Sequence, residues 1–143
     1  MSNLTTIIRD VVTDIKAGFQ IDFLAGKSDE LNLTDSAIEM LIFLQKPFNT
    51  NITMVGGGRK YEEQIVMIFG KIDKFQNDDD SRELRVTECI AIYEQFIQRL
   101  KLVDSLRVKT EAFTQLYDDN DINLTGIVAN ITIERQIIGV CLQ

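Results

Sequence analysis

The residue types that carry most enzyme chemistry are scarce in this chain. It contains no histidine, the commonest general base and the commonest zinc ligand. Its two cysteines, Cys89 and Cys141, lie in apolar stretches far apart in the sequence, which favours buried free thiols. The adjacent carboxylates Glu62 and Glu63 would point to opposite faces of a strand and would not share a substrate. We therefore expect that the protein is not an enzyme.

Two segments match ligand-binding motifs only in part. Gly26-Lys27-Ser28 follows an apolar strand, as the end of a phosphate-binding loop does, but Ile21 occupies the position of that loop's first glycine. Residues 118–126 carry Asp and Asn at alternate positions, as a calcium loop does. However, Leu124 occupies the glycine position of that motif and Asn130 the glutamate position. We therefore expect no nucleotide, no metal and no cofactor.

The strongest candidate for a binding segment is a glycine-rich, basic stretch made of Gly56, Gly57, Gly58, Arg59 and Lys60. Glycine accepts almost any backbone angle, so this stretch predicts the tip of a long β-hairpin. Two interpretations stay open. Either the tip is simply flexible, or it is an arm that orders on a neighbouring subunit, where Arg59 and Lys60 meet an acidic surface.

The clearest predicted element of secondary structure is an amphipathic helix over residues 81–103. Asp80 and Glu83 predict a capping box at its start. The apolar side chains recur at helical spacing and form one stripe, which consists of Val86, Cys89, Ile90, Tyr93, Phe96, Ile97 and Leu100. An earlier helix begins near Leu4, is capped by Ser2 or Asn3, and is ended by Gly18.

Outside these helices, apolar residues recur at about every second position, which predicts strands. Strict alternation in the segment after residue 107 places Val108, Thr110, Ala112, Thr114 and Leu116 on one face. We expect strands at 19–23, 38–44, 64–75, 108–117 and 127–133, with the long hairpin at 48–63 leading into the third. The predicted fold is α+β, with an antiparallel or mixed β-sheet of four or more strands packed against two α-helices and a long β-hairpin. One domain would cover residues 1–143.

The charge of the chain restricts its partners. A formal net charge of −7, with lysines and arginines scattered, argues against direct nucleic-acid binding, which needs basic surfaces. No apolar run approaches the ~20 residues that cross a bilayer, and no secretory signal precedes the first helix, so we expect no membrane partner and a cytoplasmic location.

In the order of its elements the chain resembles the small tail-terminator, or tail-completion, proteins of long-tailed bacteriophages and prophages. The resemblance covers essentially the whole chain and departs from the family in two ways: Pro47 ends its segment instead of starting it, and the terminal hairpin is long. The features that carry it are the helix ending in FQIDFL at 19–24, the strand 38–44, the long loop into 61–72, the helix 81–103 and the hairpin ending in GIVANITI at 126–133.

This resemblance implies a structural virion protein without catalysis or cofactor. Its copies would form a ring, commonly a hexamer, that terminates the tail tube and joins it to the head connector or neck protein. The protein would lie in the host cytoplasm during assembly and then in the virion. An acidic lumen or rim would keep passing DNA from adhering. The candidate residues for that surface are Asp29, Glu30, Asp78, Asp79, Asp118 and Asp119.

Two alternatives remain open at this point. One is another neck adaptor or head–tail joining protein of the same particle, which would bind on the portal side first. The other is a small cytoplasmic ligand-binding or enzyme domain, which would have a deep apolar pocket with convergent polar groups.

Overall fold

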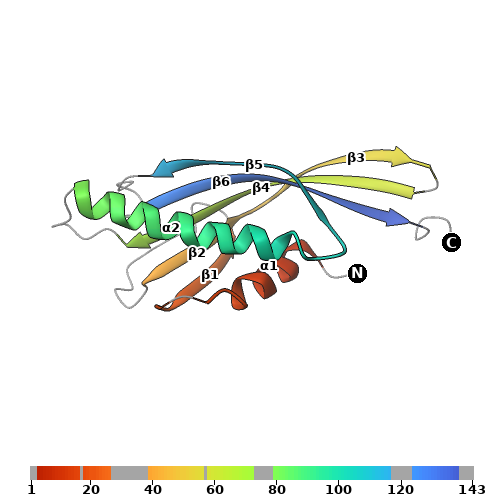
Figure 1. The fold of residues 1–143 in the computed structure, drawn as a ribbon. Coiled ribbons are helices and arrows are strands. Elements are labelled where there is room, and N and C mark those ends of the chain that lie inside the picture. The colour runs from red at the N-terminus through yellow and green to blue at the C-terminus, as the bar shows by residue number, and fades with distance from the viewer. Residues whose placement is uncertain are drawn as a thin grey trace.

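The computed structural model describes residues 3–16, 18–26, 39–56, 58–72, 79–116 and 124–138. Within these ranges a mixed six-stranded sheet packs against two α-helices, which confirms the predicted α+β class (Figure 1). The elements in chain order are α1 (Leu4–Thr13), β1 (Ile21–Gly26), β2 (Met40–Gln45), β3 (Asn49–Val55), β4 (Gly58–Ile72), α2 (Asp79–Leu100), β5 (Arg107–Leu116) and β6 (Leu124–Ile138).

The long strand β4 organises the sheet. The strand order is β1-β2-β4-β6-β5, and β1 runs parallel to β2 while the other pairs are antiparallel. β4 pairs with β6 from Gly58↔Ile138 to Ile72↔Leu124. On its other edge β4 pairs first with β3, at 58–64, and then with β2, at 67–71. The predicted long hairpin is therefore β3 and β4.

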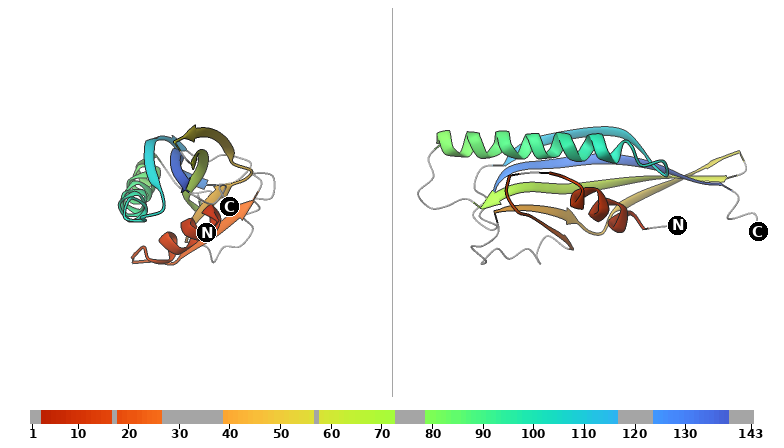
Figure 2. Two further views of the ribbon diagram at one scale, coloured as in Figure 1. Left: turned by 90° about the vertical axis from the view of Figure 1, so that its right-hand side faces the viewer. Right: turned by 60° about the horizontal axis from the view of Figure 1, so that its bottom comes forward.

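The core lies between one face of the sheet and both helices (Figure 2). Phe96 of α2 is fully buried, and its ring centroid lies 5.5 Å from that of Phe69 on β4. Ile92, outside the predicted stripe, is also buried. The buried arc of α2 is wider than one stripe because α2 contacts both the sheet and α1.

The helix boundaries differ in part from the predicted ones. Asn3 caps α1 as expected, since its side-chain oxygen accepts a 2.8 Å hydrogen bond from the Thr6 amide. α1 ends at Thr13, well before Gly18. α2 begins at Asp79, so Asp80 lies inside its first turn and the predicted cap at Asp80 is wrong.

Strict alternation in β5 is also wrong at one point. The register passes from Val108↔Ile133 to Thr110↔Thr132, so Lys109 is an extra residue in a β-bulge. Val108 therefore shares the helix-facing side of the sheet with buried Ile133, instead of lying with Thr110. One extra residue shifts the alternation of the strand by one position. Each side chain before the bulge therefore lies on the face opposite to the one that strict alternation predicts.

One glycine is required by close strand packing. A Cβ atom on Gly126 would lie 2.0 Å from the carbonyl oxygen of Phe69 on the neighbouring strand. Backbone cannot yield to such a contact, so only glycine fits in β6 at this position.

Candidate functional site

One end of the sheet extends past both helices (Figures 1 and 2). We call this three-stranded end the β-arm, and it consists of β3 with residues 58–64 of β4 and 132–138 of β6. Among the described strands, β3 pairs only with β4, and β5 starts opposite Glu134 and leaves the rest of β6 uncovered, so both outer edges of the arm carry backbone groups without a strand partner. Unpaired strand edges are sites where another chain can add.

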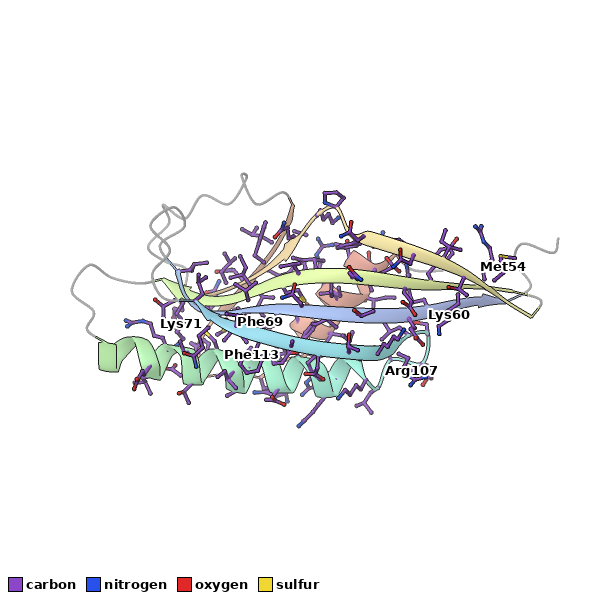
Figure 3. All side chains as sticks on the ribbon, turned by 90° about the horizontal axis from the view of Figure 1, so that it is seen from above. Met54, Lys60, Phe69, Lys71, Arg107 and Phe113 are labelled. Carbon is purple, nitrogen blue, oxygen red and sulfur yellow. The ribbon has the colours of Figure 1, made fainter. Side chains whose placement is uncertain are left out.

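The helix-facing side of the β-arm exposes apolar side chains. Ile52 and Met54 lie opposite Tyr61 and Arg59, and their exposed fractions are 51% and 69%. The Arg59 guanidinium lies 5.8 Å from the centre of the Tyr61 ring. Met54 lies further out along the arm than Lys60 or Arg107 (Figure 3). Neighbouring apolar groups in water are typical of surfaces that bind a partner.

A buried ion pair lies at the root of the arm. The side chains of Glu63 and Arg135 are only 7% and 10% exposed. Arg135 Nε donates a 2.6 Å hydrogen bond to Glu63 Oε1, and Arg135 Nη2 contacts the same oxygen. Next to this pair on β4 and β6, Ile65 and Ile133 belong to the apolar core. The ion pair therefore links the apolar core to the projecting arm. It also bridges β4 and β6 in the register that the sheet adopts.

The opposite face of the arm carries a network of charges. Glu134 lies 3.0 Å from Lys60 Nζ, 3.8 Å from Lys109 Nζ and 4.0 Å from Arg107 Nη1. Lys109 also donates a 2.7 Å hydrogen bond to Glu62. The hydrogen bond from Lys60 lowers the pKa of Glu134, and the hydrogen bond to Glu62 raises the pKa of Lys109.

Replacing Lys60 with methionine is expected to raise the pKa of Glu134 back toward its ordinary value, because the largest cause of its depression is removed. In the wild-type protein, the charge network therefore stabilises the fold at pH values above the ordinary carboxyl pKa. This stabilisation is lost as the pH falls through the lowered pKa of Glu134. A carboxyl-carbon NMR titration measures this. Lys101→Met is the control, because Lys101 pairs with Glu111. An unchanged Glu134 titration in Lys60→Met would contradict the assignment.

The predicted site residues divide into three groups. Gly56 forms the hairpin turn with φ +57°, while Gly58, Arg59 and Lys60 lie within β4. Lys60, predicted to meet a neighbour's acidic surface, pairs with Glu134 of its own chain. Asp79 begins α2, and its side chain is not among those described. The remaining residues lie outside the described ranges; they are Gly57, Asp29, Glu30, Asp78, Asp118 and Asp119.

Cys89 and Tyr93 are two α2 side chains that belong to the apolar core. Burial raises the pKa of the Cys89 thiol to about 12, so this cysteine stays protonated and unreactive. The pKa of Tyr93 is also raised. The larger cause is burial, and the second is the 2.8 Å hydrogen bond that the Tyr93 hydroxyl donates to Glu111. Across the described ranges, no group of acidic or cysteine side chains has the arrangement of a metal site. No helix in this part of the chain has the length and apolar character of a membrane span.

No family model matches this chain, and no characterised protein is similar enough to count as a relative.

Sequence reasoning missed several residues of this region. The charged residues of this region come together only because β4, β5 and β6 lie side by side. They are Lys60, Glu62 and Glu63 of β4, Lys109 of β5, and Glu134 and Arg135 of β6. The one signal in the sequence was the alternation of Ile52 and Met54 before the glycines, which predicted a long hairpin here but did not predict its charged partners.

Proposed function

We propose that this protein is a structural virion component whose copies form a ring, commonly a hexamer, that terminates a phage tail tube and joins it to the head connector. The observation that supports this most is the β-arm, a projecting sheet end whose outer edges no described strand covers and on which Ile52 and Met54 are exposed. A protein that acts by assembly needs such surfaces and needs no catalytic residues. The proposed partners are copies of this chain, the tail tube protein and the neck protein, and no nucleic acid or membrane.

The acidity of the chain supports the same proposal. A net charge of −7 per copy, repeated around a ring, would repel the DNA that passes through the tail. Host cytoplasm during assembly and the virion afterwards are the corresponding locations.

Deleting the gene from its phage or prophage is expected to yield separated heads and tails, with tails of irregular length, because tube growth is no longer stopped. Electron microscopy of the lysate measures both effects. The wild-type gene supplied in trans should restore joined particles, whereas Met54→Asp should not. Leu84→Asp is the matched control, because Leu84 is an exposed apolar residue of α2, outside the arm.

Joined particles with tails of normal length in the deletion would overturn the proposal. A neck adaptor is distinguished by where the protein is found: on isolated heads for an adaptor, and on isolated tails for a terminator.

A further inference from the structure

An apolar groove lies between α1 and the end of α2. Its volume is about 340 Å³, and Leu102, at 80% exposure, stands open to water beside it. Ile7, Val11 and Val103 supply the other apolar lining, and Arg99 contributes one cation. Asp10 and Asp14 border this groove. The groove is therefore apolar inside, with one more negative than positive charge around it.

The two aspartates are locally unfavourable for α1. They lie four residues apart on one helix face and repel each other. They also lie at the C-terminal end of α1, where the helix dipole favours cations, and the last turn contains no basic residue. Neither carboxylate has an ion pair within the described part of the chain. Two carboxylates that destabilise their own helix, without a compensating ion pair, are expected where a binding partner supplies the positive charge.

The β-arm carries features that complement this groove. Met54 and Ile52 are apolar and exposed, and the neighbouring Arg59 has no carboxylate partner among the described residues. The arm projects past the ends of both helices, so its outer end points away from the groove of its own chain (Figures 1 and 3). A second copy of the chain presents a groove with matching apolar and charged groups.

We propose that the end of the β-arm of one copy docks in the α1–α2 groove of the next, with Met54 and Ile52 against Ile7 and Leu102 and with Arg59 beside Asp10 and Asp14. Because arm and groove are different surfaces of one chain, this contact is head-to-tail, and a head-to-tail contact closes a ring when the rotation between neighbouring copies divides a full turn. The proposal deepens the proposed function and rests on it for ring closure, while the contact itself is testable with purified protein.

Charge reversal tests the ionic part of the contact. Arg59→Glu and Asp10→Lys/Asp14→Lys are each expected to weaken self-association about 10- to 100-fold, because like charges then meet across the interface. The chain with all three substitutions should recover most of the wild-type affinity. Light scattering over a concentration series measures the association. Arg85→Glu is the control, since it makes the same charge change on α2, away from the groove and the arm.

Disulfide trapping tests the apolar part. Met54→Cys and Leu102→Cys are made in separate chains, both with Cys141→Ser, while buried Cys89 is retained. On mild oxidation the mixture should form a cross-linked pair of one chain of each kind, more than either chain alone. No cross-link in the mixture, or self-association that both charge reversals leave unchanged, would overturn the docking proposal. A ring that persists in that case would leave the terminator function standing, because the gene deletion tests that function separately.

Discussion

Replacing Phe96 with alanine is expected to lower the free energy of unfolding by about 3–5 kcal/mol. Phe96 is fully buried in the middle of α2, and its ring meets Phe69 of β4 edge-on with centroids 5.5 Å apart. Alanine would leave a cavity between helix and sheet, where Phe69 also packs edge-on against Tyr93. Urea unfolding followed by circular dichroism measures the change.

Gln98→Ala is the matched control for this substitution. Gln98 lies on the same helix but faces solvent, so its replacement should change the free energy of unfolding by no more than about 0.5 kcal/mol. If Phe96→Ala cost less than about 1 kcal/mol, α2 would not be packed on the sheet through this stripe.

Replacing Arg135 with methionine is expected to cost about 3–5 kcal/mol, because Glu63 would stay buried without its guanidinium partner. Methionine keeps much of the apolar length of the side chain, so the loss reports on charge more than on packing. The same unfolding measurement applies, and the arm should lose order before the core because the pair lies at its root. Hydrogen exchange of the amides in 58–64 should therefore accelerate more than that in 67–71.

Two further variants separate this effect from general damage. Lys101→Met breaks the more exposed pair with Glu111 and should cost less than about 1 kcal/mol. The double variant Glu63→Leu/Arg135→Met removes both charges and should recover most of the loss, since no unpaired charge then stays buried. A single variant as stable as the wild type would show that the pair does not hold the arm to the core.

The β-arm connects these stability predictions to assembly. Its outer end exposes Met54, while its root is held by Glu63 and Arg135. A rigid arm loses less conformational entropy on docking than a flexible one, so the root pair supports binding at a distance from the contact. Arg135→Met should therefore weaken self-association as well as folding.

Local sequence patterns were sufficient for much of the fold. Asn3 as the cap of α1, the buried stripe around Phe96 and the inward alternation of Ile127 to Ile133 all follow from interactions within a few residues. The bulge at Lys109 did not follow, because an extra residue shows only when the partner strand is in place.

The sequence by itself determined the α+β class, the approximate positions of the helices and strands, and the presence of a long hairpin. The tertiary structure alone decided which charges meet and which surfaces stay open. Arg135 reaches Glu63 across 72 residues of chain, and Asp10 lines one groove with residues at the end of α2 that are still further away in sequence. Such pairings depend on the register of β4 against β6 and on the packing of α1 against α2. Register and packing are set by burial of the whole core, because local preferences are weak compared with the free energy of removing that apolar surface from water.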